Sequence, residues 1–560
     1  MERLEDQSVD ERKIRYEHVP FDTSDDDFMG DIPPITNPSF RGADDGSHLE
    51  SGRSSPSVSV PEPASFEEAI AATGFGKYNI FLMFVTIFPS VAEIFEVVAL
   101  SYVLPIAECD LNLTLSDKGM LNAMTFAGMV TSALFWGRLC DMIGRKSIIK
   151  YGYIVGGGFA IIVSLSTNIT VLSIAKFCGG FIINGPYSAS VSHLSEFHSS
   201  KYRARVQIVR GATLSSAYIF LPLLAWGILP QKLDFSPFGL IDYHSWNVFL
   251  FICAIPTITS GLIYFFVPES PKFLMTLGRN EEALNIFRKV YRINTGNAED
   301  TFPINCLVKE TYYEVADITQ KQRPNILKEG ISQMKPFMSS PHINRILLIC
   351  CNAFLLTMSM NLVKLWLPQI FQATSDHQIS ESKNETDVCS IFEELRTPNL
   401  TVAEGCTVNL DNMSVYINSI IVGITGVISF SLAGTLVNLL GKKTLTVVFS
   451  FAAGCFCCAV YFSTNSLTMM ILYSLDLSLG CIADNVLTTT TLELFPTTLR
   501  TSALCLHLMF GRFGTVVGNI ILPQLLQIGC APPIFFLGFL VFGSLLLTVL
   551  YPSTENKPLL

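Results

Sequence analysis

Apolar segments of about 20 residues recur along this chain, and they limit its fold more than any other feature. Each segment is long enough to cross the roughly 30 Å hydrocarbon core of a bilayer as a helix. The composition agrees, because 49% of the 560 residues are hydrophobic and only 15% are charged. A soluble domain usually carries about a quarter of charged residues. The sequence therefore predicts an all-α, multi-pass membrane protein.

Twelve candidate spans can be placed in the sequence. They lie near residues 79–103, 119–138, 147–166, 170–194, 206–228, 246–267, 343–366, 414–438, 444–463, 467–491, 502–526 and 531–550. They divide into two groups of six, over residues 79–267 and 343–550, with a cytoplasmic linker at residues 268–342. An even number of spans places both termini on one side of the membrane, where residues 551–560 form a short tail.

Residues 1–78 differ from the rest of the chain in charge. They contain 17 Asp and Glu against 7 Lys and Arg, a difference of −10 that equals the net charge of the whole chain. Aliphatic residues are few, so this region is predicted to be a disordered acidic tail. Nucleic-acid binding has no support from this charge balance. The strings "YEHV" at Tyr16 and "ENKPLL" at Glu555 fit sorting signals, which trafficking adaptors would bind through the tails.

The distribution of Lys and Arg predicts the orientation of the spans. Loops on the side of the tails contain Arg138, Arg145, Lys146, Lys150, Lys201, Arg203, Arg205, Lys442, Lys443 and Arg500, besides the basic linker. Loops on the opposite side contain little beyond Lys232, Lys383 and Arg396. Because basic loops stay in the cytoplasm, both termini are predicted to be cytoplasmic.

Glycosylation motifs agree with this orientation. The sequons at Asn112, Asn384 and Asn399 fall in loops assigned to the lumen or the outside, where glycans are added. Two cysteines, Cys389 and Cys406, flank a segment of the long luminal loop at residues 367–413. They are candidates for a disulfide bond there, since this compartment is oxidising.

An internal repeat relates the two groups of spans. The string "GRLCDMIGRK" from Gly137 has a weaker copy, "GTLVNLLGKK", that begins 297 positions later. The strings "EFHSSKYR" at Glu196 and "ELFPTTLR" at Glu493 are separated by the same 297 positions. Two unlike motifs with one offset indicate a duplicated six-span unit. Parallel repeats of this kind build transporters whose halves rock about a central site.

The first of these motifs resembles the G-x-x-x-D-x-x-G-R-[RK] signature of the major facilitator superfamily. The string "PESPKFL" at Pro268 resembles the sugar and organic-ion porter branches of that superfamily. Together with "FEVVALSYVLPIAECDL", "DKGML" and "YHSWNVFLFICAIP", it makes the chain similar to the synaptic vesicle glycoprotein 2 family. The luminal loop is shorter here, at about 47 residues. The resemblance implies twelve transmembrane helices in two pseudo-symmetric six-helix halves, with a central cavity between them.

The motif is expected to act as a conformational latch at the cytoplasmic ends of the spans. Asp141 would face a helix terminus and the Arg145 guanidinium, while Gly137 and Gly144 would permit close approach and a tight turn. The candidate latch residues in the two repeats are Gly137, Asp141, Gly144, Arg145, Glu196, Arg203, Glu493 and Arg500. Asn438 replaces the Asp in the second copy, so a weaker latch is expected there. The alternative is that these residues only anchor the loops in the cytoplasm.

Ionisable side chains at membrane depth require an explanation, because each costs about 2.5–3.5 kcal/mol on insertion scales. Glu93 and Glu96 lie three residues apart on one face of the first span, which suits a proton site or a cation ligand. Arg512, in the middle of span eleven, is the expected counter-charge, so the three side chains are predicted to lie close together. The alternative is a buried structural pair.

Three further polar residues are candidates for contact with a substrate or a coupling ion. Asp484 lies in span ten. Asn184 and Tyr187 belong to a break in span four that could line the cavity, although helix packing explains them equally well. Lys364, near the outer end of span seven, is predicted to snorkel toward the membrane surface.

The function predicted from these features is secondary transport of a small organic or sugar-like solute by alternating access, with proton coupling left open. The rival is a non-transporting vesicle membrane glycoprotein that acts through protein partners. No nucleotide loop, metal spacing or nucleophile triad stands out, so neither an enzyme nor a cofactor or metal site is predicted. The expected partners are a small solute and membrane lipid, without nucleic acid. The expected location is a vesicle or the plasma membrane.

Overall fold

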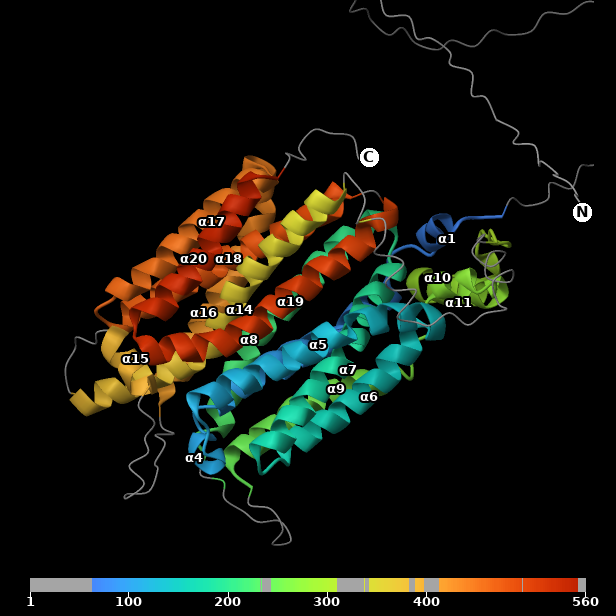
Figure 1. The fold of residues 1–560 in the computed structure, drawn as a ribbon. Helices are drawn as coiled ribbons and strands as arrows, with labels where there is room; N and C mark the ends of the chain where they lie inside the picture. Colours follow the sequence, from blue (N-terminus) through green and yellow to red (C-terminus); the bar gives the residue numbers. More distant parts are fainter. Residues whose placement is uncertain are drawn as a thin grey trace, which may run out of the picture. The chain divides into compact units, whose positions relative to one another are not determined.

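The computed structural model describes residues 63–231, 233, 243–309, 337, 342–381, 388–396, 412–495 and 497–551. These residues are almost entirely helical (Figure 1). The only bridge between extended segments among them joins Ala64 to Leu307. The chain divides into two units, Met1–Val60 and Pro61–Leu560, and the described residues all belong to the second unit.

Six long helical segments form the N-terminal half. They are α2 (Lys77–Val85) followed by α3 (Ile87–Val103), α5 (Leu115–Ile143), α6 (Arg145–Ser164), α7 (Ile169–Glu196), α8 (Ser200–Ile228) and α9 (Ser245–Ile263). A short helix, α4 (Glu108–Leu111), connects α3 to α5. Polar side chains fix the starts of these helices. Thr114 caps α5 in a capping box with Asp117, and the Asn168 side chain accepts a bond from the backbone of α7.

The C-terminal half repeats this arrangement. Its long helices are α14 (His342–Glu381), α16 (Met413–Leu440), α17 (Lys442–Ala459) with η4 (Val460–Phe462), α18 (Ser466–Leu494), α19 (Thr497–Ile528) and α20 (Ala531–Val549). A short helix, α15 (Val388–Arg396), lies between α14 and α16 in the chain. Positive-φ glycines open the third helix of each half, Gly144 before α6 and Gly441 before α17. These glycines are 297 positions apart, as the repeat requires.

Ten of the described helical segments are long and apolar enough to cross a membrane. The two other long helices, α5 and α16, complete the duplicated pattern, and α16 begins with an apolar stretch at Met413–Ser429. Large apolar side chains remain exposed on the bundle, such as Phe539 at 71% and Leu546 at 68% on α20. Such a surface is expected where helices face lipid. The all-α, twelve-helix prediction is confirmed.

The two halves meet most extensively along two pairs of helices, with a smaller contact between α3 and α14. Helix α5 packs against α19, and α8 packs against α16 (Figure 1). Glycines permit close approach in both pairs: a Cβ on Gly119 would lie 2.3 Å from the Asn519 carbonyl oxygen, and one on Gly423 would lie 2.8 Å from that of Tyr218. Gly119 is near the start of α5, and Asn519 is near the end of α19. Both positions lie toward the end of the bundle where α15 is found, which we call the α15 end (Figure 1). The halves are therefore tightly joined at this α15 end.

Short helices pack together at the opposite end of the bundle, the α11 end. They are α1 (Phe66–Ala72), α10 (Pro271–Thr276), α11 (Asn280–Thr295) and η2 (Glu299–Thr301). Their apolar cluster includes Phe66, Ile70, Met275 and Phe287, all buried. The prediction of a disordered tail up to residue 78 is therefore wrong for α1 and the start of α2. Hydrophobic residues in this stretch pack against the linker, which composition averaged over the whole tail concealed.

Disulfide bonding differs from the sequence prediction. Cys389 of α15 is bonded to Cys530, the residue that precedes α20. The predicted pairing of Cys389 with Cys406 is therefore wrong, and Cys406 lies outside the described residues. Sequence proximity favoured the bond within the loop, but folding brings α15 onto the α19–α20 connection. Cys109 of α4 is also disulfide-bonded.

Of the three glycosylation candidates, the structure describes Asn112. Asn384 and Asn399 lie outside the described residues. Asn112 ends α4 with a left-handed backbone, φ 49°, which asparagine tolerates better than most residues.

Asn294 joins the α11 end to the first transmembrane segment. Its side-chain amide donates to the Thr73 and Gly74 carbonyls, each at 3.2 Å, and to Asn79 Oδ1 at 2.8 Å. Its Oδ1 accepts from the Tyr78 backbone N–H at 3.0 Å. One side chain thus contacts four polar groups where α1 gives way to α2.

We expect Asn294→Ala to loosen α1 from the bundle. Leaving these partners unpaired should cost about 1–3 kcal/mol. Limited proteolysis of the purified full chain should therefore cut faster between α1 and α2. The matched control is Asn297→Ala, because the side chain of that exposed residue donates to the Tyr291 hydroxyl at 3.2 Å and does not reach α1 or α2. Equal cleavage rates in the two variants would contradict the role given to Asn294.

Candidate functional site

A charged contact joins the two halves near the middle of the bundle. Arg512 of α19 places Nη2 3.9 Å from Glu93 Oε1 of α3. The same guanidinium donates through Nη1 to Asn184 Oδ1 of α7. Both partners belong to the N-terminal half, whereas Arg512 belongs to the C-terminal half. The structure thus brings together three of the residues predicted from the sequence.

Asn184 is held in a fixed orientation by α5. Its Nδ2 donates to the Met129 carbonyl at 3.1 Å and to Ser132 Oγ at 3.2 Å. With both donors directed at α5, the amide oxygen is left to face Arg512. Pro186 follows two residues later inside α7 and supplies no backbone N–H. Helix α7 nevertheless runs without interruption from Ile169 to Glu196, so the predicted break in span four is not present. It is the Asn184 side chain itself that presents a polar group to the seam between the halves.

Glu96 does not join this contact, contrary to the sequence prediction. Lys176 of α7 places Nζ 2.7 Å from Glu96 Oε1 and 2.5 Å from the Glu96 carbonyl oxygen. Both side chains are buried, and both belong to the N-terminal half. A Cβ on Gly179 would lie 2.9 Å from Glu96 Oε1, so this glycine makes room for the pair. Sequence reasoning missed Lys176, although a lysine well inside an apolar span was a usable signal.

A second cation of the N-terminal half lies close to Glu93. Arg210 of α8 donates through Nη1 to the Tyr187 hydroxyl at 2.9 Å and through Nε to Gln207 at 2.8 Å. The charges that act on the Glu93 carboxyl include both Arg512 and Arg210. Tyr187 was predicted as a candidate, but Arg210 was not. Its place well inside α8 could have revealed it.

Two charged residues of the C-terminal half face the same region. Asp484 of α18 accepts a bond from Thr357 Oγ1 of α14 at 3.1 Å. Lys364 of α14 lies with Nζ 5.8 Å from the ring centre of Tyr218, which is on α8 in the other half. Cys481 and Asp484 are further electrostatic neighbours of the Lys364 ammonium. The prediction that Lys364 snorkels is therefore wrong, because this lysine points across the seam instead.

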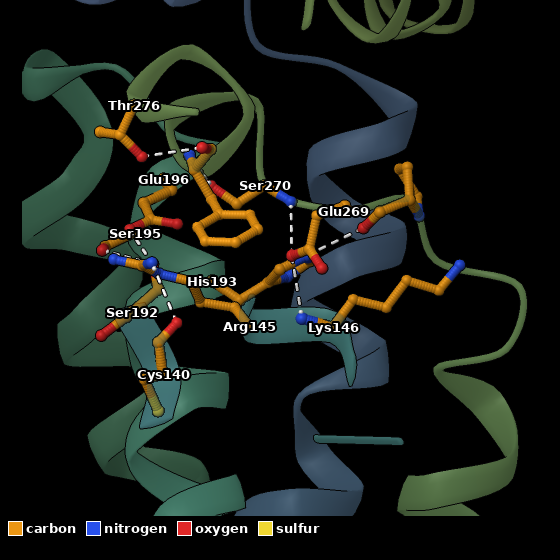
Figure 2. A network of polar contacts seen from close by, with 12 residues as sticks. Cys140, Arg145, Lys146, Ser192, His193, Ser195, Glu196, Glu269, Ser270 and Thr276 are labelled. Carbon is orange, nitrogen blue, oxygen red and sulfur yellow. Dashed lines mark hydrogen bonds and ion pairs between the residues drawn. The ribbon is translucent and has the colours of Figure 1, made fainter. Parts of the chain in front are cut away.

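The latch motif forms a polar network at the α11 end of the N-terminal half (Figure 2). Arg145 Nε lies 3.4 Å from Glu196 Oε1, and Arg145 Nη1 donates to the Cys140 carbonyl at 3.3 Å. Glu269 of the linker accepts from the backbone N–H of Lys146 at 2.9 Å, which caps the first turn of α6. Sequence reasoning did not single out Glu269. The side chain of Asp141 lies outside the described residues.

The second repeat contains the equivalent ion pair. Lys442 pairs with Glu493, and both residues lie 297 positions after Arg145 and Glu196. Arg203 pairs with Glu67 of α1 at 2.7 Å, and its counterpart Arg500 has no hydrogen-bond partner for Nε among the described residues. Each of these ion pairs lies inside one half or its attached helices. Within the described residues, the motif ion pairs therefore brace each half separately in this conformation.

The two motif glycines have different surroundings. Gly144 has φ +97°, and a Cβ there would lie 2.6 Å from Glu269 Oε2 and 2.7 Å from Phe273 Cε1. A tight turn and close approach are therefore present at Gly144, as predicted. A Cβ on Gly137 would meet nothing within 4 Å. The close approach predicted for Gly137 does not occur among the described residues in this conformation, because the surface beside it is open.

Comparison with known proteins gives the following relatives. Synaptic vesicle glycoprotein 2B of Rattus norvegicus is 31% identical over 244 residues, which cover 43% of this chain and 36% of that protein. Synaptic vesicle glycoprotein 2C of Homo sapiens is also 31% identical over 244 residues, with 43% and 34% covered. The matched region thus spans about a third of the length of these curated relatives.

Solved structures share the fold. The inward-open xylose transporter XylE from E. coli aligns with a TM-score of 0.61 at 14% identity, covering 86% of this chain and 98% of that one. Its partially occluded inward-open conformation aligns with a TM-score of 0.58 at 13% identity, covering 84% and 98%. The model of the Major Facilitator Superfamily matches residues 78–382, which is 305 of 560 positions and more than half of the chain. With two repeats of six long helices in the part of the chain that the structure describes, this chain belongs to the Major Facilitator Superfamily.

Proposed function

We propose that this protein is a secondary transporter that carries a small organic solute by alternating access. The observation that supports this most is the contact of Arg512 with Glu93 and Asn184 across the seam between the halves. Charges at membrane depth are expensive, and an apolar seam would join two static halves at lower cost. A polar contact at this place is reasonable if it has to break and re-form as the halves rock.

The distribution of contacts between the halves supports a state that is open at the α11 end. The close glycine contacts of α5 with α19 and of α8 with α16 lie toward the α15 end. At the α11 end of α5, Gly137 has open space beside it, and Met142 and Ile143 are 57% and 51% exposed. Closing this end would bring the motif helices of the two halves together. The latch is therefore proposed to act in the opposite state.

The orientation that we propose puts the α11 end in the cytoplasm. The Cys389–Cys530 disulfide at the α15 end favours an oxidising compartment on that side. The basic loops of the sequence favour the same assignment. Both termini would then be cytoplasmic, and glycans would be carried by Asn384 and Asn399, with Asn112 as a further site. A vesicle or the plasma membrane is the proposed location.

The rival function is that of a non-transporting vesicle membrane glycoprotein that acts through protein partners. The matches to synaptic vesicle glycoproteins 2B and 2C favour it. The two functions differ in whether the charges at the seam are needed. A transporter loses uptake driven by a pH gradient when Glu93 or Arg512 changes, whereas partner binding at the tails does not depend on them. Uptake by the reconstituted protein, screened with and without a pH gradient, decides between the two functions.

Glu93 is the proposed proton-coupling residue, because its carboxylate can be released from Arg512 by protonation. We expect Glu93→Gln to fold, because Asn184 still accepts from the Arg512 guanidinium, and to exchange solute, but to lose uptake driven by a pH gradient. Glu96→Gln is the matched variant. It should lower the folded yield instead, because Lys176 would stay buried without its partner, at a cost of about 3–5 kcal/mol. Reconstituted uptake and size-exclusion profiles measure the two effects. Loss of pH dependence in Glu96→Gln, with Glu93→Gln unaffected, would reverse the assignment.

Closure at the α11 end can be tested at the two motif glycines. Gly137→Leu should melt like the wild type, because a side chain there has open space, but it should block closure and reduce turnover. Gly144→Ala should lower the melting temperature, since its positive φ and the nearby Glu269 disfavour a Cβ, at a cost of about 1–3 kcal/mol. Thermal melts and uptake rates of both variants give the comparison. Normal turnover in Gly137→Leu would remove the proposed closure.

A further inference from the structure

The described charges around the seam do not balance. Two acids, Glu93 and Asp484, face three bases, Arg210, Lys364 and Arg512. The formal sum is −2 + 3 = +1. The neighbouring Glu96 and Lys176 neutralise each other inside the N-terminal half and do not alter this sum.

His507 of α19 is a further titratable side chain that faces this region. Its ring nitrogens lie 3.2 Å from Thr488 Oγ1 and 3.4 Å from Thr491 Oγ1, and Asp484 acts on it electrostatically. A protonated ring would add to the positive charge, so the excess is at least one unit.

The excess positive charge is carried by Arg210 and Lys364. Glu93 lies 3.9 Å from Arg512, and Asp484 accepts from Thr357. Among the described residues, neither Arg210 nor Lys364 has a carboxylate within ion-pair distance. Arg210 is bonded to two neutral side chains, and Lys364 lies over a tyrosine ring. Unpaired cations at membrane depth are costly, so an anion that sits between them is favoured.

Two tyrosines connect these cations into one lining. The Tyr187 hydroxyl accepts from Arg210, and the Tyr218 ring lies beneath Lys364. Glu93, Lys364 and Tyr187 all lie close enough to Tyr218 to act on it electrostatically. The two tyrosine rings therefore line the same region. Arg210 comes from α8 and Lys364 from α14, which places one cation on each half. Aromatic walls beside separated cations suit a small organic molecule that carries a negative group.

We propose that the central site selects a small organic anion, whose negative charge is compensated by Lys364 and Arg210 on opposite halves. This proposal rests on the transport function proposed above and names the charge class of its solute. An anion that bridges the two halves compensates the excess positive charge and stabilises the closed site. A neutral solute would leave both cations without a counter-charge.

Cys481 provides a reporter inside the site, because its thiol lies beside the Lys364 ammonium and is not disulfide-bonded. The full-length protein is treated in native-like membranes with two methanethiosulfonates of similar size. One carries a sulfonate and the other a trimethylammonium group. Peptide mass spectrometry then gives the modification rate of each cysteine. The exposed thiol of Cys306, in the linker, serves as the internal reference.

The anionic reagent should be preferred at Cys481 by about tenfold or more relative to Cys306, since a cleft of one sign concentrates its counter-ion. Lys364→Met should remove most of this preference, Arg210→Met should reduce it, and Lys364→Arg should retain it. Preference for the cationic reagent would overturn the proposal. So would a ratio unchanged by Lys364→Met, or a Cys481 that neither reagent reaches.

Uptake into proteoliposomes separates this proposal from the transport function. A panel of small carboxylates is compared with a panel of neutral sugars. Uptake of sugars but not of carboxylates would contradict the proposed anion site and support the proposed transport function. A strong anionic labelling preference without uptake of any solute supports the site and overturns transport. Uptake of carboxylates that Lys364→Met abolishes supports both.

Discussion

An arginine at membrane depth has to be paired, and Arg512 finds Glu93 and Asn184 on the opposite half of the protein. This single requirement organises the centre of the structure. It explains why α3 presents Glu93 to the seam and why α7 presents the Asn184 oxygen. It also explains why Asn184 is anchored through its amide to α5, since a freely rotating amide would hold the guanidinium less well. The remaining packing has to bring these helices within reach.

The duplicated motifs supply the rigidity that this seam needs. Each half carries an ion pair that connects its third and fourth long helices, Arg145 with Glu196 and Lys442 with Glu493. In the N-terminal half, Glu269 of the linker caps α6 and so connects α10 to the same network. Two internally braced halves with a polar seam can rotate as units, because the bonds inside each half are not the ones that have to break. The duplication therefore accounts for the matching ion pairs that brace the two halves.

The sequence predicted the spans, the repeat and the meeting of Glu93 with Arg512, because these follow from apolar length, from a constant offset and from the cost of buried charge. The sequence prediction failed where the direction of a side chain around its helix axis decides which residue it contacts. Glu93 and Glu96, three residues apart, are offset by about 60° around the helix axis. That offset is enough to direct one carboxylate to the seam and the other to Lys176 on α7. The Cys389–Cys530 bond and the packing of α1 likewise depend on tertiary contacts that no local pattern contains.

The two buried acid–base pairs differ in a way that assigns them separate roles. Lys176 contacts both the carboxylate and the backbone carbonyl of Glu96 within 2.7 Å, and a glycine makes room for this pair. Breaking this contact would leave Lys176 buried without its partner. Arg512 lies 3.9 Å from Glu93 and shares its guanidinium with the neutral oxygen of Asn184. Protonation of Glu93, or an anion arriving from solution, would therefore cost the second pair far less than the first. Of these two pairs, only the looser one spans the two halves, so the exchangeable interaction lies where a conformational change can use it.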